Sequence, residues 1–283
     1  MVSIGNKVDF AVVFTVTNAN PNGDPLNGNR PRVGFDGRGE VSDVCIKRKI
    51  RNRLQDLGLD VFVQSDDRRI DDAKSLKERA DSFITSAGKD EEEFVRSVCE
   101  KWIDVRAFGQ LFAFKKKTGD AGVSIGIRGP VSVHPAFSLS PINITSTQIT
   151  KSVNSETGDK RGSDTMGMKH RVDCGTYVFY GSINPQLARK TGFSDQDVVK
   201  FREALTTLFE NDSSSARPEG SMDIHRVIWW KHNSSNGQYS SGKVHNSLKI
   251  AEKKGKENNA YGILDYDIVV EKLEGLEPEV YEN

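Results

Sequence analysis

The sequence predicts an α+β fold of the ferredoxin-like type, in which helices pack on a β-sheet and two insertions interrupt the chain. Short segments rich in β-branched residues predict strands at Val8–Thr17, Thr176–Ile183 and Arg226–Lys231. Amphipathic helices are expected between them, at Ser42–Leu54 and from Ser194 onward. With 283 residues, 36% of them hydrophobic, the chain is long enough for one large domain with insertions.

The N-terminal part predicts a buried strand, a loop and a helix. Val8–Thr17 is apolar and too short for a helix before the turn-forming residues of Asn18–Gly39. Ser42 is a plausible N-cap for the helix that follows. One face of this helix is apolar, formed by Ile46, Ile50, Leu54 and Leu57.

Two further amphipathic helices are expected next, at Asp72–Ala87 and Asp90–Trp102. The second helix begins with four acidic residues, which suits the positive end of a helix dipole. The apolar positions expected on one face of each helix are Ala73, Leu76, Ala80 and Phe83 in the first and Phe94, Val98 and Trp102 in the second.

The middle of the chain predicts extended segments and one polar excursion. Val105–Phe114 and Gly122–Pro141 are expected to be extended. Asn143–Lys169 is rich in Ser, Thr, Asn, Gly and Lys and has no apolar period, so we expect it to leave the core and return.

In the C-terminal part, Ser194 with Asp197 predicts a capped helix whose core face includes Phe201 and Leu205. A late strand is expected at Gly262–Glu271, after the polar stretch His232–Ala260.

Composition excludes several classes of protein. Lys+Arg and Asp+Glu both number 40, so a polyanion would have to bind a local cluster of cations. Cys45, Cys99 and Cys174 have no CxxC spacing, and we interpret them as reduced thiols, with no zinc or other metal site. The start MVSIGNKVDF does not resemble a signal peptide, and no apolar run approaches the roughly 20 residues of a membrane span. We therefore expect a soluble, cytoplasmic protein with no membrane partner.

The helix at Ser42–Leu54 is basic on a face beside its apolar stripe. Five cations and no acid lie between positions 47 and 53. At about 100° per residue, Lys47, Arg48 and Arg51 form one contiguous arc. A solvated helix face is the alternative interpretation, but such faces usually mix acids with bases. The cation arc and the free N–H groups at the helix N-terminus together predict a site for consecutive phosphates.

The loop before this helix reads NANPNGDPLNGNRPR, from Asn18 to Arg32. Turn formation alone would explain its Pro and Gly residues. The loop also carries amides and cations, which suit contacts with a ribose-phosphate chain. The residues expected to make these contacts are Asn20, Asn22, Asn29, Arg30 and Arg32.

Several motifs resemble one known family. They are the loop NANPNGDPLNGNRPR, then VSDVCIKRKIRN, DVRAFG, IRGPVSV and DTMGMKH, in this order along nearly the whole chain. Together they resemble the backbone subunit of the type I-C CRISPR surveillance complex, Cascade, within the Cas-seven superfamily of repeat-associated proteins.

The resemblance implies a hand-shaped protein. Its parts would be a modified RNA-recognition-motif palm, a helical finger insertion at residues 64–104 and a β-hairpin thumb at residues 143–170, within one domain of residues 1–283. Copies would stack head to tail along one guide RNA (crRNA), in a filament that does not close. The other implied partners are target DNA, through pairing with the guide, and the 5′-handle, large and small subunits of Cascade.

The resemblance also assigns roles to residues. The palm-helix residues implied to hold the RNA backbone are Ser42, Lys47, Arg48, Arg51 and Asn52. In the thumb, Met166, or alternatively Met168, would unstack a base, with Lys169 and His170 nearby. The sequence alone favours a methionine packed on the palm instead. Arg106 and Arg128, each next to a turn with Gly, are further candidate RNA contacts, whereas Phe108 is expected in the core.

No catalytic pattern is evident, so we expect no enzymatic activity and no cofactor. The five histidines have no metal-ligand spacing. Asp24 in NGDP could be compared with a cleaving aspartate of type III relatives, but we expect it to cap a turn. Two alternatives are a metal-independent endoribonuclease acting on repeat RNA and a small-nucleotide enzyme that uses the NGDP loop, which lacks GK[ST] and GxGxxG patterns.

Overall fold

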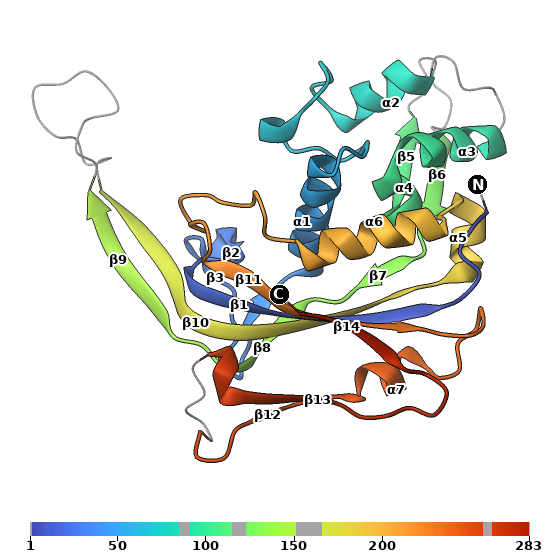
Figure 1. The fold of residues 1–283 in the computed structure, drawn as a ribbon. Coiled ribbons are helices and arrows are strands. Elements are labelled where there is room, and N and C mark those ends of the chain that lie inside the picture. The colour runs from blue at the N-terminus through green and yellow to red at the C-terminus, as the bar shows by residue number, and fades with distance from the viewer. Residues whose placement is uncertain (1, 85–90, 115–122, 151–165, 257–261, 283) are drawn as a thin grey trace, which may run out of the picture.

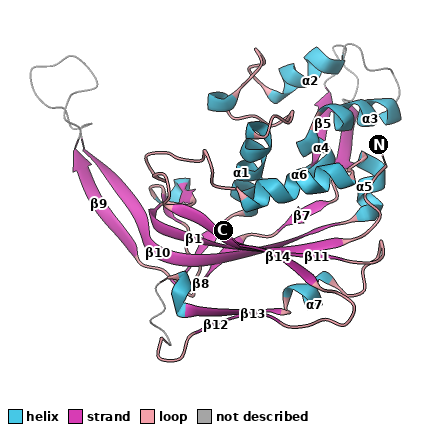
Figure 2. Cartoon of the chain, viewed as in Figure 1, coloured by secondary structure: helices cyan, strands magenta, loops and turns pink. Residues whose placement is uncertain are grey.

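The computed structural model describes residues 2–84, 91–114, 123–150, 166–256 and 262–282. A large antiparallel sheet forms the centre of the molecule (Figure 1). Helices cover one face of this sheet, and a small two-stranded layer lies against the other face (Figures 1 and 2). The mixed α/β class predicted from the sequence is therefore confirmed.

The central sheet is built around one strand, β1 (Val8–Ala19), which pairs with β10 on one side and β11 on the other. All neighbouring strands are antiparallel. The strands of the main path, in order across the sheet, are β14 (Pro278–Glu282), β11 (Met222–Lys231), β1, β10 (Met166–Ile183), β8 (Ala136–Pro141) and β4 (Arg38–Val41). A further short strand, β7 (Val131–Val133), also pairs with β10.

Strand β1 is apolar on both sides because both faces of the sheet are covered. Phe10, Val12 and Phe14 belong to the core beneath the helices, whereas Ala11 and Val13 belong to the core on the opposite face. Successive side chains of a strand point to opposite faces, so a strand buried on both faces reads as a continuous apolar run. This is the pattern from which the strand was predicted.

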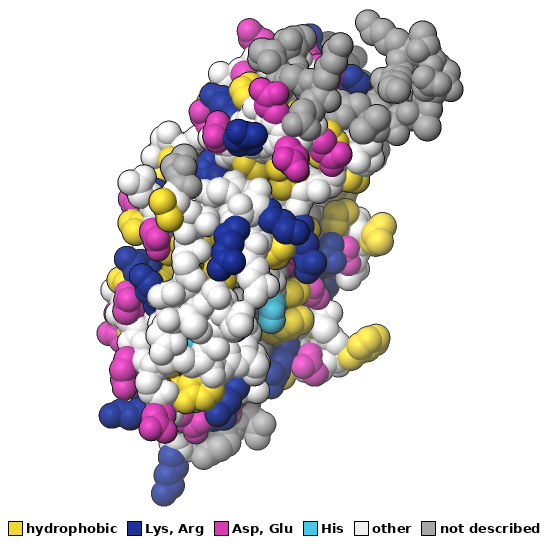
Figure 3. Space-filling model, turned by 90° about the vertical axis from the view of Figure 1, so that its right-hand side faces the viewer, with side chains coloured by type: hydrophobic (Ala, Val, Ile, Leu, Met, Phe, Trp, Pro, Cys, Tyr) yellow, Lys and Arg dark blue, Asp and Glu magenta, His cyan; other side chains and the backbone are white. Residues whose placement is uncertain are grey.

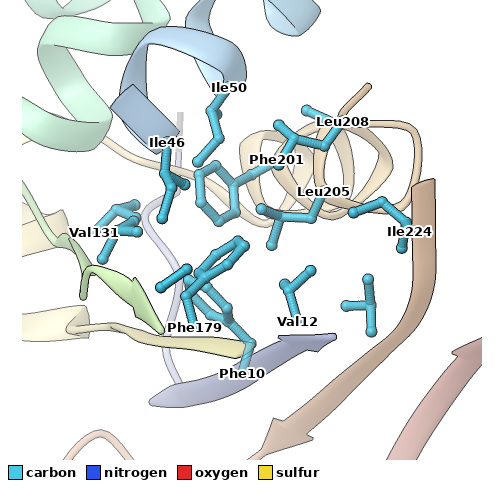
Figure 4. Packing of buried hydrophobic residues seen from close by; sticks show 14 of the residues in the cluster. Phe10, Val12, Ile46, Ile50, Val131, Phe179, Phe201, Leu205, Leu208 and Ile224 are labelled. Carbon is cyan, nitrogen blue, oxygen red and sulfur yellow. The ribbon is translucent and has the colours of Figure 1, made fainter. Parts of the chain in front are cut away.

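The main core lies between the sheet and helices α1 (Asp43–Asp56), α5 (Pro185–Thr191) and α6 (Asp195–Thr206). Both predicted caps are present: the Ser42 hydroxyl accepts the Cys45 N–H at 3.3 Å, and Ser194 forms a capping box with Asp197. Figure 4 shows side chains of α1 and α6 meeting those of the sheet. The labelled residues are Ile46 and Ile50 of α1, Phe201, Leu205 and Leu208 near α6, and Phe10, Val12, Val131, Phe179 and Ile224 from the strands.

A second core is formed by residues between positions 62 and 127. It contains α2 (Leu76–Ile84), α3 (Glu91–Lys101), α4 (Ile103–Phe108) and the pair β5 (Gly109–Phe114) and β6 (Val123–Arg128). Phe62, Phe94, Trp102 and Phe112 pack against one another at its centre.

Two predictions in this region are corrected. The helix expected from Asp72 begins at Leu76, which is exposed and not part of an apolar face. The segment expected to be extended from Val105 begins as helix α4. Long-range contacts explain this helix: the Asp104 carboxylate accepts two backbone N–H groups of residues 62 and 63, and Arg106 binds Asp197.

The opposite face of the sheet is covered by α7 (Ser241–His245), β12 (Leu248–Glu252) and β13 (Tyr266–Val270). The first two elements lie in the polar stretch His232–Ala260, for which the sequence predicted no helix or strand. Val244 of α7 and Leu248 of β12 are buried, and they pack with Ile228 and Trp230 of the sheet. No helix in the described ranges is long and apolar enough to cross a membrane.

A two-stranded ribbon projects beyond the sheet (Figure 1). It consists of β9 (Ile144–Thr150) and the first part of β10, from Met166 to Val172. Strand β10 therefore begins ten residues before the predicted Thr176, and both described ends of the predicted polar excursion are strands. The segment 152–164, which we expected to be exposed, lies outside the described residues.

Candidate nucleic-acid interface

The loop after β1 is held in a fixed shape by its own polar groups. Gly23 approaches Asn29 so closely that a Cβ atom at position 23 would lie 2.0 Å from the Asn29 amide oxygen. Asp24 caps the short 3-10 helix Pro25–Asn27, since its carboxylate accepts the Leu26 N–H at 3.2 Å. The expectation that Asp24 caps a turn is confirmed. Gly28 and Asn29 both have positive φ angles, as the turn requires.

Asn20 was expected to be an exposed amide, and this is corrected. The side chain is buried, with 5% exposure, and its Nδ2 donates to the Asn29 carbonyl at 2.7 Å. Asn20 therefore ties the two ends of the loop together. A backbone bond from Asn20 N to Ala216 O holds the same end of the loop against a second segment.

Asn22 joins the loop to the N-terminus of α1. Its Oδ1 accepts hydrogen bonds from both the backbone N–H and the hydroxyl of Ser42, each at 2.9 Å. Ser42 in turn caps the helix through Cys45. These two predicted residues are in contact, and both are half-buried. They position the loop on the helix, directly beside the N-terminus of α1.

Arg30 joins the loop to the ribbon. Its Nη1 donates to the Ser146 hydroxyl of β9 at 3.0 Å, and the same hydroxyl lies 2.8 Å from Nδ1 of His170 on β10. The Ser146 hydroxyl can accept from Arg30 while it donates to an unprotonated Nδ1. Two predicted residues that are 140 positions apart thus meet through a serine that the sequence analysis did not identify. We name the loop Asn18–Arg32 together with this ribbon the loop–ribbon surface.

The pairing of the ribbon assigns its side chains to two faces. Met166, Met168 and His170 alternate along β10 and therefore lie on one face, the face that Arg30 contacts. Lys169 and Arg171 lie on the other face. Met166 and Met168 are exposed by 62% and 55%. The interpretation of Met166 as packed on the palm is therefore wrong.

The cations of α1 are less free than their angular arrangement predicted. Lys47 Nζ lies 3.0 Å from Asp43 Oδ2, one turn earlier on the helix. Arg51 Nε donates to the buried Asp104 at 2.9 Å and its guanidinium lies over the Phe108 ring, with only 14% of its side chain exposed. Arg51 thus fixes the second core to α1, and its charge is already balanced.

Arg48 is the cation of this arc for which no carboxylate of the described residues lies within hydrogen-bonding distance. Its Nη1 lies 3.4 Å from the Val63 carbonyl, and the side chain is half-buried. Burial and the nearby Arg51 guanidinium lower the pKa of Arg48. An anion bound beside Arg48 would relieve this repulsion, so the arc still favours a phosphate at this one position.

Lys49 belongs to the core side of the same helix. It is buried, forms an ion pair with Asp212 and lies 5.5 Å from the centre of the Phe209 ring. Burial lowers its pKa. These contacts explain why the charge run from position 47 to 53 does not form one basic surface.

The remaining predicted residues differ in exposure. Arg106 is buried, with both Nε and Nη2 bound to the Asp197 carboxylate at 3.1 and 2.6 Å, so its prediction as an RNA contact is corrected. Arg128 is exposed at the end of β6, a strand that lies at the other end of the molecule from the ribbon (Figure 1). Arg32 and Asn52 are half-buried, and Arg32 lies 3.6 Å from Asp24.

Comparison with known proteins supplies the family. The model of the family "CRISPR-associated protein Cas7" matches residues 6–271. The chain belongs to this family. It is 25% identical over 288 residues to the CRISPR-associated protein Cas7 of Haloferax volcanii, a match that covers 95% of this chain and 83% of the relative. Family membership confirms the predicted function in its general form, a CRISPR-associated, RNA-binding backbone subunit.

A solved structure shares the fold. A chain of a CRISPR RNA-guided surveillance complex, described as pre-nicking, is similar with a TM-score of 0.50 and 20% identity, over 79% of this chain and 75% of that chain. A chain of another CRISPR RNA-guided surveillance complex gives a TM-score of 0.46 and 18% identity, over 79% and 68% of the two chains.

In this Cas7-family chain, the sheet face opposite the helices is not available to RNA. RNA-recognition motifs stack bases on the sheet face that lies opposite their helices. Here that face is occupied by α7 and β12, and Ala11, Val13 and Trp230 on it are fully buried. The candidate interface therefore lies at one end of the sheet, on the loop–ribbon surface and the adjacent start of α1.

The sequence analysis missed a polar segment beside this surface. Ser213, Ser214 and Ser215 are exposed, and the loop that carries them is bound to the β1 end through Asn20 N–Ala216 O and Thr17 N–Ser221 O. A run of three serines after Asp212, with Arg217 two residues beyond the run, was the available signal. Its significance depends on a contact between segments almost 200 residues apart.

Proposed function

We propose that this chain is the multi-copy backbone subunit of a type I-C Cascade complex and that its loop–ribbon surface holds the sugar-phosphate backbone of the crRNA. One observation carries the proposal beyond family membership. Arg30, Ser146 and His170 connect the loop to the ribbon, so amides, cations and exposed methionines from three segments form one continuous surface. Such a surface can contact successive nucleotides without reading their sequence.

The arrangement of strands supports a ferredoxin-like palm. Strands β11, β1, β10 and β8 are adjacent in this order and antiparallel, with α1 after β1 and α6 after β10. The second core supports a separate finger, with a longer extent than the proposed 64–104 because β5 and β6 belong to it. The projecting ribbon supports a thumb at 143–170.

The proposed contacts differ in kind. Arg30, Lys47 and Arg48 would bind phosphates, and Ser42 with Asn22 would present the N–H groups of α1 to the backbone. Met166 would separate two stacked bases, at a cost of a few kcal/mol that repeated backbone contacts offset. Lys169 lies on the opposite ribbon face from Met166, so it would contact a different stretch of RNA.

We further propose that the chain acts as a scaffold and does not cut RNA. Asp24, the residue compared with a cleaving aspartate, is engaged in capping. His232 and His245 are buried around Asp9, on the far side of the sheet from the helices. Target DNA would reach the protein by pairing with the presented guide, and the remaining Cascade subunits would join at the ends of the filament.

The test is RNA binding by purified protein with and without the Arg30→Ala and Arg48→Ala changes. For single-stranded RNA the logarithm of affinity falls with the logarithm of salt concentration by about 0.7 for each phosphate contact. The double variant should lose two contacts and so lower the slope by about 1.4. Lys101→Ala removes an exposed cation at the end of α3, outside the proposed site, and is the matched control.

An unchanged slope in the double variant would exclude the loop–ribbon surface as the binding site. The same samples, incubated with repeat RNA in EDTA and run on a denaturing gel, test the scaffold role. Discrete cleavage products that disappear with a single His or Asp substitution would favour the endoribonuclease alternative.

A further inference from the structure

Two apolar side chains stand fully exposed beside the ribbon. Phe35 and Leu26 have relative exposures of 114% and 98%. Both lie on turns that adjoin the root of the ribbon: Ile142 N donates to Gly37 O at 3.0 Å, and Arg30 binds Ser146. Exposed single apolar residues are common, but two fully exposed ones on neighbouring turns indicate a contact surface.

These turns are ordered by internal hydrogen bonds. Around Phe35, Gly34 N donates to Arg38 O at 2.8 Å, and Arg38 N donates to the Asp36 carboxylate at 3.1 Å. Leu26 is held by the Asp24 cap. A side chain that is presented on a preformed turn loses little conformational entropy on binding, so both residues suit the role of anchors in an interface.

A large cleft lies at the other end of the molecule. It has a volume of about 1170 Å³ and is lined by α3, by the end of α5 and by Arg106. Val95 and Cys99 contribute apolar surface, and Glu100 and Arg189 are among its charged residues. A cleft of this size is large enough to take the side chains of a protein turn.

The positions and charges of the two features favour a second copy of the chain. In Figure 1 the ribbon projects at one end and α3 and α5 lie at the other. Figure 3 faces the latter end and shows acidic and basic side chains interspersed. A mixed surface does not suit a polyanion. Contacts between two different surfaces of the same protein generate an open, head-to-tail array.

We propose that the Phe35 and Leu26 turns of one copy dock in the α3–α5 cleft of the next copy. The inference rests on the proposed filament and names the anchors of its repeated contact. Leu26 lies on the loop of the loop–ribbon surface, and we assign its side chain to the neighbouring copy and the polar groups of that loop to RNA. RNA is the less suitable partner for Phe35, because the Asp36 carboxylate next to it is 64% exposed.

The first experiment measures assembly separately from RNA binding. Phe35→Asp and the control Val269→Asp, an exposed strand residue of the small layer, are titrated onto an RNA that fits one copy and onto an RNA that fits six. Phe35→Asp should reduce the cooperativity between copies by roughly tenfold or more. It should leave binding to the short RNA unchanged, and Val269→Asp should match the wild type on both RNAs.

Either of two results would overturn the proposal: wild-type cooperativity in Phe35→Asp, or weakened binding of that variant to the short RNA, which would mean that Phe35 touches RNA. Failure of the wild type to bind either RNA would instead count against the proposed function.

A second experiment tests the contact without RNA. Phe35→Cys and Arg189→Cys are combined in one chain, and concentrated protein is treated with a short bis-maleimide. A ladder of cross-linked multimers is expected. The pair Val269→Cys with Arg189→Cys should give none, and the absence of a ladder from the first pair would exclude the contact.

Discussion

The loop–ribbon surface and the basic helix α1 carry similar residues but use them differently. In α1, Arg51 and Lys49 are committed to Asp104 and Asp212, and both join parts of the protein to each other. On the loop–ribbon surface, Arg30 is bound to a neutral hydroxyl, and the methionines have no core to pack in. A cation with a buried carboxylate partner maintains the fold, whereas one with a neutral partner keeps its charge available to a ligand.

The largest effect is expected on the α1 side, from Asp104→Ala. This carboxylate is 1% exposed and binds Arg51 and two backbone N–H groups, so its removal leaves a cation and two donors unpaired. The free energy of unfolding, measured with denaturant, should fall by about 3–5 kcal/mol. Asp60→Ala, which breaks the exposed pair with Lys101, should cost about 1 kcal/mol or less. If both variants lost a similar amount of unfolding free energy, the pair of Arg51 with Asp104 would not stabilise the fold, and Arg51 would be available to a ligand.

The next effect is expected on the loop–ribbon surface, from Arg30→Ala. Loss of one hydrogen bond from a charged group to phosphate is worth about 1.5–3 kcal/mol, so RNA affinity should fall by roughly tenfold or more. Stability should change little. Arg171→Ala, on the other face of the ribbon, provides the comparison, with binding measured by filter retention or fluorescence anisotropy. If Arg171→Ala were the more harmful change, the assignment of the ribbon faces would be reversed.

A smaller effect is expected from Ser146→Ala. The substitution removes the hydroxyl that Arg30 and His170 share, but it leaves both charged or titratable groups in place. RNA affinity should fall only a few-fold, since a neutral hydrogen bond contributes about 1 kcal/mol. Combined with Arg30→Ala, the change should be less than additive, because the two residues are in contact. Full additivity would mean that this contact does not prepare Arg30 for RNA.

The smallest change in affinity is expected from Met166→Ala, which removes a wedge without removing charge. The readout is the fluorescence of 2-aminopurine placed at successive positions of the bound RNA. Wild-type protein should raise the signal at regularly spaced positions, and Met166→Ala should remove this increase while Met168→Ala retains it. The opposite result would assign the wedge to Met168.

Local signals made much of the fold predictable. The apolar run of β1, the Ser42 cap and the Ser194–Asp197 capping box are each encoded within a few residues. Helix α4 and strand β12 were missed because long-range contacts of Asp104 and of Leu248 stabilise them. In the candidate site, the sequence pointed to segments that the structure brings together, but it did not show which cations form ion pairs. The partners Asp104 and Asp212 lie far along the chain from α1, whereas Asp43, four residues before Lys47, was a readable signal.

Strand β10 has a mechanical consequence. Its 18 residues run without interruption from Ile183, in the fully buried core, to Met166 on the ribbon. At about 3.3 Å per residue the strand is on the order of 60 Å long. Its inner part is held in the sheet by β1 and β8, whereas its outer part pairs with β9 in the ribbon. The packing of the sheet therefore fixes the direction of the ribbon, and a force that a neighbouring molecule exerts on the ribbon is transmitted along β10 to the centre of the sheet.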